Sequence, residues 1–374
     1  MLVYAIGLCL LYGAKAVCAQ TPLSTSATSP APASPPTPSD AGTPTLHVYT
    51  NLKQVPVLVL TPDHERTKSI NTSRFRVSID SGPRFRPTYI RREGDDPISL
   101  AILIDVTNPE NELLPPLIKA IPSLSPDFLH PQDRVSIYVI DCSFNRTAYD
   151  APANPATLAA AVERAMAPWQ IRRQPKGAVV PCKPSLPLWD SMAMVVDDLV
   201  HQSGRRVLLA ITDGQDTGSK TLWSKVMNRA QVESIAVFGL MPLPSITSKR
   251  SQERGAIFTV NSPFYERQED KFDQICELSG GVELQSSEGA LPFHLKEFTQ
   301  MVRERYILEF PRGRNEEPGV HTLDVSLAGS KLYIRPSGIS VPVASEDEVK
   351  GASPLPADPS REPAMGKRKV LPPQ

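Results

Sequence analysis

"PISLAILID", residues 97–105, is an almost continuous apolar run that ends in an aspartate. Such runs are typical of strands buried on both faces of a parallel sheet. Further runs of this kind are "DRVSIYVIDC" (133–142), "RRVLLAITDGQD" (205–216) and "ESIAVFGLM" (233–241). Segments with helical spacing and composition lie at 155–169, 188–204, 220–231, 271–281 and 293–306. Buried strands that alternate with helices predict an α/β fold with a doubly wound, mostly parallel sheet flanked by helices.

Shorter, alternating strands flank this region on both sides. Residues 46–96 hold an N-terminal β segment, and residues 306–343 hold a C-terminal β segment with Gly and Pro turns. A small isolated sheet is only marginally stable. We therefore expect the two segments to meet in one β-rich module beside an α/β domain at 97–305.

The two ends of the chain have a different composition. Residues 1–19 resemble a secretory signal peptide, with an apolar stretch too short to span a bilayer and small residues before Gln20. Residues 20–45 and 344–374 are rich in Pro and small polar residues, and we expect a disordered linker and a disordered tail. The sequence predicts a secreted or periplasmic protein with no transmembrane span in the mature chain.

Charge and motif content exclude several classes of function. Lys+Arg and Asp+Glu both number 40, so no basic excess indicates a nucleic-acid partner. No Gly-x-Ser-x-Gly, His-Glu-x-x-His or P-loop motif is present. "ILIDVTN" is similar to the first motif of haloacid-dehalogenase-type phosphatases, but Thr107 stands where that motif needs an aspartate. We predict that the protein is not an enzyme; a metal-dependent hydrolase is the least favoured alternative.

Two of the predicted strands end in aspartates. Asp105 closes the first buried run and Asp213 the third, with Thr107 two positions after Asp105. The carboxyl ends of parallel strands meet at one rim of the sheet, where ligands bind. Carboxylate and hydroxyl oxygens are the ligands that Mg²⁺, Mn²⁺ and Ca²⁺ prefer. The alternative is that both aspartates accept hydrogen bonds from loop amides without an ion.

Several segments together carry a family resemblance. They are "LAILIDVTNP", "VSIYVID", "PLWDSM", "LLAITDGQD", "IAVFGL" and "ICELSGG". In this order they resemble the von Willebrand factor type A domain of the secreted bacterial subgroup called VWFA-related. The resemblance covers roughly residues 46–343 and implies a Rossmann-like fold.

The resemblance also implies a degenerate metal-ion-dependent adhesion site (MIDAS). Asp105, Thr107 and Asp213 match three of the family's five ligand positions, whereas Pro109 and Leu186 stand where hydroxyl ligands are expected. We expect at most one weakly bound divalent cation. Asn108 and Ser185 are candidates to replace the missing ligands at the binding rim. For Asp216, a supporting role at the rim and a helix-capping role near Lys220 are both open.

Cysteine usage fits an exported protein. Removal of the signal would leave Cys142, Cys182 and Cys276, which allow one bridge and one free thiol. Cys142 and Cys182 are both expected at the upper rim, where a bridge would close a loop of about 40 residues and stabilise by roughly 4 kcal/mol. Bridged and free cysteines both stay open.

The function implied is that of a secreted protein-binding or adhesion module whose upper rim takes an unknown protein or peptide ligand. A structural scaffold for cell-envelope assembly, without a metal, is the alternative.

Overall fold

The computed structural model of the chain describes residues 52–67, 69–108, 110–172, 186–216, 218–243, 271–311, 319–338 and 340–343. The predicted signal peptide, linker and tail at 1–19, 20–45 and 344–374 lie outside the described residues, as do Ser185 and Cys182. Within the described part of the chain, no helix has the length and apolar character needed to cross a bilayer.

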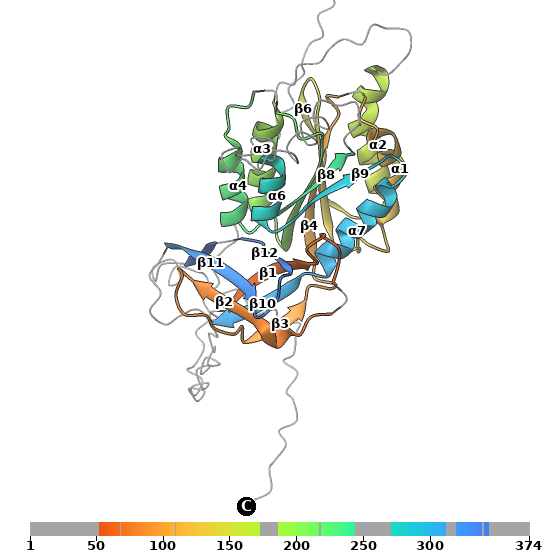
Figure 1. Cartoon of the computed structure of the whole chain (residues 1–374). Coiled ribbons are helices and arrows are strands. Elements are labelled where there is room, and N and C mark those ends of the chain that lie inside the picture. The colour runs from red at the N-terminus through yellow and green to blue at the C-terminus, as the bar shows by residue number, and fades with distance from the viewer. Residues whose placement is uncertain are drawn as a thin grey trace, which may run out of the picture. The chain divides into compact units, whose positions relative to one another are not determined.

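The four apolar runs form the centre of a six-stranded sheet (Figure 1). In spatial order its strands are β6 (Phe144–Pro152), β5 (Arg134–Ile140), β4 (Ile98–Asp105), β7 (Arg205–Ile211), β8 (Ala236–Pro242) and β9 (Glu283–Ser286). All neighbours are parallel except β6, which runs antiparallel to β5. Every residue of β4 is buried, as the unbroken apolar run predicts for a strand covered on both faces.

Helices cover both faces of this sheet (Figure 1). One face packs against α1 (Leu114–Ala120), α2 (Pro155–Arg172) and α7 (Leu291–Arg303). The other packs against α3 (Leu188–Val200), α4 (Trp223–Val232) and α6 (Lys271–Ser279). Alternate residues of β4 divide between the two cores, with Ile102 in the first and Leu103 in the second. The prediction of a doubly wound α/β sheet is confirmed.

The flanking strands pair with one another across the length of the chain. A four-stranded antiparallel sheet has the order β12 (Tyr333–Pro336), β1 (Leu52–Leu60), β10 (Tyr306–Pro311) and β3 (Tyr89–Arg92). A three-stranded sheet has the order β13 (Ser340–Val343), β11 (Gly319–Leu327) and β2 (Phe75–Ile79). Short 3-10 turns occupy Thr72–Arg74 and Pro122–Leu124. The predicted β-rich module of N- and C-terminal strands is therefore present.

Strand β1 joins this module to the α/β domain because its successive side chains point into two different cores. Val55, Val57 and Val59 face the core between the two antiparallel sheets. Leu58 and Leu60 point the other way and belong to the core beneath the six-stranded sheet. Because successive side chains of a strand alternate between its faces, one strand serves both cores.

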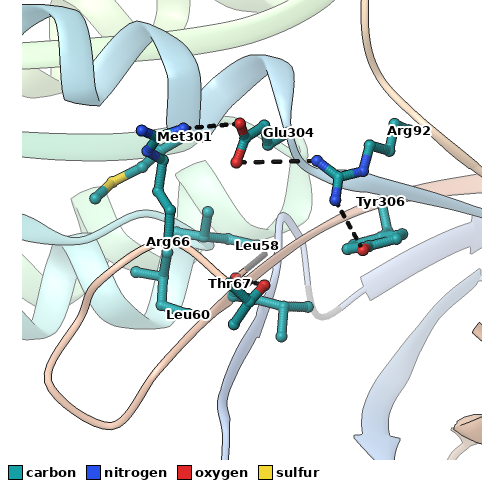
Figure 2. A pocket seen from close by; sticks show the side chains of 9 residues that line it. Leu58, Leu60, Arg66, Thr67, Arg92, Met301, Glu304 and Tyr306 are labelled. Carbon is teal, nitrogen blue, oxygen red and sulfur yellow. Dashed lines mark hydrogen bonds and ion pairs between the residues drawn. The ribbon is translucent and has the colours of Figure 1, made fainter. Parts of the chain in front are cut away.

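Charged side chains reinforce the same junction (Figure 2). Arg66 forms ion pairs with Glu304 at 2.8 Å and with Glu297 at 3.1 Å. Glu304 also faces Arg92 at 3.9 Å, and Arg92 donates to the Tyr306 hydroxyl at 3.4 Å. These contacts line a small pocket between α7 and the strands of the β-rich module.

Several predicted boundaries differ from the structure by a few residues, and two elements were missed. The predicted helix at 293–306 ends at Arg303, and Tyr306 begins strand β10. Strand β6 and helix α1 were not predicted. Strand β6 lies at the sheet edge with no buried residue, so its sequence lacks the apolar run that marks the central strands.

Candidate functional site at the strand ends

Asp105 ends β4 and Asp213 follows the adjacent strand β7, at the point where the sheet order reverses. From β4 the chain moves outward to β5, and it later returns to the other side of β4 as β7. In open α/β sheets, ligands bind outside the carboxyl ends of the strands at such a reversal. We call residues 105–108 and 212–216 the switch-point rim.

Asp105 is the most buried carboxyl group of the rim. Its side chain is almost fully enclosed, with 5% of the residue surface exposed. The Thr107 amide and hydroxyl donate to Asp105 Oδ1 at 3.0 and 2.6 Å. The Thr212 hydroxyl donates to Asp105 Oδ2 at 2.9 Å and accepts from the Gly214 amide at 3.1 Å. Asp105 thus links the ends of β4 and β7.

Burial dominates the electrostatics of this carboxyl group. Desolvation raises the pKa of Asp105, and the negative charge of Asp213 raises it further. The hydrogen bonds from Thr107 and Thr212 act in the opposite direction without cancelling the effect. The rim therefore holds a carboxylate that is costly to ionise and well supplied with donors.

Asp213 and Asn108 form the outer layer of the rim. The side-chain Nδ2 of Asn108 donates to Asp213 Oδ2 at 3.3 Å, which joins the loop after β4 to the loop after β7. The Gln215 amide donates to Asp213 Oδ1 at 3.1 Å, and the Glu110 amide donates to Asn108 Oδ1 at 3.1 Å. Asn108 is exposed and Asp213 is half-buried. These two side chains present polar groups to solvent at the ends of β4 and β7.

Asp216 organises the next turn of the same loop. It accepts from the Gly218 and Ser219 amides at 3.1 and 2.9 Å and from the Ser219 hydroxyl at 2.5 Å. Ser219 Oγ in turn accepts from the Trp189 and Asp190 amides, at 3.1 and 3.2 Å, in the first turn of α3. The residue before α3 is Pro187, which provides no side-chain cap. Ser219 thus caps α3 from another loop, with Asp216 holding it in place.

Asp190 returns the interaction from the helix to the loop. Its carboxylate accepts from the Lys220 and Thr221 amides at 3.0 and 2.8 Å. Desolvation acts to raise the pKa of Asp190, but the hydrogen bonds from Thr221 and Lys220 outweigh it and lower the pKa overall. Asp190 thus ties the loop after β7 to the first turn of α3.

An arginine fixes the neighbouring edge of the site. Arg172, at the end of α2, forms an ion pair with Asp141 after β5 and donates to the Val106 carbonyl. Cys142 beside it is disulfide-bonded, and its partner lies outside the described residues. The predicted pairing with Cys182 stays a prediction. Cys276 is a buried free thiol, and burial raises its pKa.

The rim supplies oxygen donors of the kind that a hard cation binds. The Thr107 hydroxyl donates its hydrogen bond to Asp105, which leaves the lone pairs of Thr107 Oγ1 for another partner. Asp213 adds a carboxylate, but Leu186 has no side-chain oxygen. No cluster of three His, Cys, Asp or Glu residues suited to a metal occurs in the described ranges. The donors fit a cation held mainly through water molecules.

Three residues important to the rim were missed by sequence reasoning. Thr212 lies beside the predicted Asp213, and a search for hydroxyls at strand ends could have found it. Ser219 and Arg172 act across loops far apart in sequence, and no local signal marks them. The structure brings Asp105, Thr107, Asn108 and Asp213 together, and places Asp216 beside the start of α3.

The sequence matches no protein-family model and no curated protein. Among solved structures, the fold is similar to proximal thread matrix protein 1 from the mussel byssus, at 9% identity and a TM-score of 0.39, over 60% of this chain and 51% of that one. It is also similar to the conserved hypothetical protein BatB from Bacteroides thetaiotaomicron, at 14% identity and a TM-score of 0.32, over 55% of this chain and 98% of that one. The chain thus spans about half the length of the mussel protein. At these values the likeness carries no argument about function.

Proposed function

We propose that this chain is an exported, non-enzymatic protein-binding module of the von Willebrand factor type A kind, which binds a protein or peptide at the switch-point rim. The observation that carries the proposal is the Asn108–Asp213 pair, which bridges the loops after β4 and β7 at the sheet reversal. The sequence resemblance of the strand-end motifs to type A domains adds support. Adhesion and a secreted or periplasmic location belong to the same proposal.

The rim has the construction that a binding surface needs. Binding groups must be held rigidly, because ordering flexible side chains costs affinity. Here Asp105 fixes the residues beside the Asn108–Asp213 pair, because its oxygens accept three hydrogen bonds from Thr107 and Thr212. The loop beyond it is fixed to α3 through Ser219.

The chemistry of the rim indicates what its ligand offers. Asp213 supplies acceptor oxygens, and Asn108 supplies both a donor and an acceptor. A peptide with an Arg or Lys side chain, or with free backbone amides, would complement them. A divalent cation is a second way to satisfy Asp213: it would be coordinated weakly by Asp213 and Thr107 and could accept a ligand carboxylate.

A capture experiment with matched variants tests the rim. Full-length wild type, Asp213→Ala and the control Asp324→Ala are used to capture proteins from the envelope of the producing organism. Asp324 is an exposed carboxylate on β11, so both variants lose one negative charge. We expect one protein that is retained by wild type and by Asp324→Ala and lost with Asp213→Ala. Equal retention by all three would refute binding at the rim and would favour a scaffold that makes its contacts elsewhere.

The cation is tested separately by calorimetric titration of Mg²⁺, Mn²⁺ and Ca²⁺ into wild type and Asp213→Ala. Heat that depends on Asp213 would support a cation site. Capture that is unaffected by EDTA, with no heat from any of the three ions, would leave a rim that binds without metal.

A further inference from the structure

A second polar pocket lies at the other end of the sheet. Asp213 follows the carboxyl end of β7, whereas Arg205 and Arg206 begin that strand at its amino end. The pocket has a volume of about 110 Å³. A volume of only about 10–15 Å³ by this kind of measure accommodates one water molecule, so a small polyatomic ion has room here. Its described walls include Gln54 and Pro56 of β1, Ser234 after α4, and three arginines.

Arg205 is a mostly buried charge without a carboxylate of its own. Only 19% of its side-chain surface is exposed. Its guanidinium donates to the neutral Gln54 Oε1 at 2.6 Å. Its ion pair among the described residues is with Asp96 Oδ2 at 3.8 Å, and Arg91 holds that same oxygen at 2.5 Å. Because Asp96 is closer to Arg91, it neutralises Arg205 only in part. A buried charge that lacks a close partner destabilises the folded state.

The other two arginines of the wall differ in how well they are neutralised. Arg305 uses two of its nitrogens on Glu93, each at 2.7 Å, and a third on the Ser337 hydroxyl at 3.3 Å. Arg206 lies 3.7 Å from Glu233, the described carboxylate on the wall. Glu233 is held more closely by Arg229, at 2.8 Å. Arg305 is thus neutralised by Glu93, whereas Arg205 and Arg206 each share a carboxylate with a more closely placed arginine outside the wall.

The pKa of Arg205 is lowered mainly by its burial. The negative charges of Glu93 and Asp96 oppose this decrease, and the positive charges of Arg305 and Arg91 add to it by smaller amounts. An anion in the pocket would act against both the burial and the repulsion.

We propose that this arginine pocket binds a small doubly charged oxyanion, of which inorganic phosphate is the simplest example. The planar guanidinium fork donates paired hydrogen bonds that match a phosphoryl group. The walls come from β1 on one side and from β7 and the end of α4 on the other. A bound anion would therefore join the β-rich module to the α/β domain. The phosphoryl group is either a free ion or the terminal group of a monoester.

Thermal unfolding of the full chain tests the proposal. Inorganic phosphate, glycerol 3-phosphate and sodium chloride are compared at equal ionic strength on wild type, Arg205→Gln, Arg206→Gln and the control Arg146→Gln. Arg146 lies on β6, away from the pocket, and is paired with Asp198 at 3.0 Å. A ligand that binds only the folded state raises the melting temperature.

We expect phosphate to raise the melting temperature of wild type and Arg146→Gln beyond the chloride effect. In Arg205→Gln and Arg206→Gln the apparent affinity should fall roughly ten-fold or more, because each loses a charged donor. A larger shift with glycerol 3-phosphate would identify a monoester as the ligand class. No shift beyond chloride, or an equal shift in all four proteins, overturns the proposal. If Arg205→Gln does not fold, Arg206→Gln decides the result alone. Neither outcome depends on the rim, so the two proposals fail independently.

Discussion

The Glu93→Ala substitution should destabilise the whole molecule, because Glu93 neutralises a fully buried arginine. Glu93 follows β3 in the β-rich module, and Arg305 lies between α7 and β10. Each residue is 1% exposed, and two hydrogen bonds of 2.7 Å join them. A backbone hydrogen bond from the Glu93 amide to the Arg305 carbonyl, at 2.8 Å, also joins these two segments of the chain.

The expected loss follows from what remains after the carboxylate is removed. Arg305 keeps its bond to Ser337 but stays buried, and Arg205 adds repulsion nearby. Removing one partner of a buried ion pair costs about 3–5 kcal/mol in the free energy of unfolding. The double variant Glu93→Leu/Arg305→Met removes both charges and should cost less than Glu93→Ala alone, because no isolated charge is left.

Urea denaturation of the full chain measures the effect, followed by tryptophan fluorescence and far-ultraviolet circular dichroism. Trp169, Trp189 and Trp223 all lie in the α/β domain, so fluorescence reports on the part of the fold away from Glu93. The control is Asp197→Ala, which removes an exposed pair with Arg229 and should change stability by about 1 kcal/mol or less. A cost for Glu93→Ala no greater than this control, or a fluorescence transition unchanged from wild type, would refute the argument that the junction stabilises both parts.

Substitutions at three further positions test the rim and the packing. Asp105→Ala should cost about 2–3 kcal/mol in urea denaturation, because three donors lose their acceptor. Asp105→Asn should cost less, because burial raises the pKa of Asp105 and its ionisation therefore opposes folding. Wild type loses stability as the pH rises above the unfolded pKa of Asp105, so the stability of Asp105→Asn relative to wild type should rise with pH and be lowest in acid. Ser219→Ala should cost about 1–2 kcal/mol by removing the cap of α3, and restoration by Ser219→Thr would support the hydroxyl's role. Gly280→Ala should cost about 2 kcal/mol or more, because Gly280 has φ +98° and a Cβ would lie 2.5 Å from Ser337 Cα; wild-type stability in this variant would contradict the packing.

The sequence predicts the parts of this fold that have a strong local pattern. Strand β4 is recognisable because burial on both faces requires an unbroken apolar run, and Leu58 with Val57 shows the alternation of a strand between two cores. Strand β6 escapes prediction because an exposed edge strand needs no such run. Patterns of this kind locate elements but do not reveal which faces of them meet.

The same limit applies to the site. Asp105 and Asp213 were predicted because strand ends in a parallel sheet share one rim, and the structure brings their loops together through Asn108. The hydrogen bond that Asp105 accepts from Thr212 joins the ends of two strands 107 residues apart in sequence, and no pattern local to Asp105 marks it. Likewise, Ser219 reaches α3 across a stretch of 30 residues. Residues that act over such separations become visible only once the chain is folded.

The most direct test of the central claim is site-specific photo-crosslinking from two positions, one at the carboxyl ends of the sheet's strands and one at their amino ends. A photo-reactive residue is placed at Asn108 on the switch-point rim, or at Gln132, an exposed residue before the amino end of β5. Each full-length protein is irradiated with the envelope of the producing organism, and the crosslinked products are identified by mass spectrometry. We predict one protein crosslinked from position 108 and not from position 132. The same product from both positions, or a product from position 132 alone, would contradict a binding rim at the ends of β4 and β7.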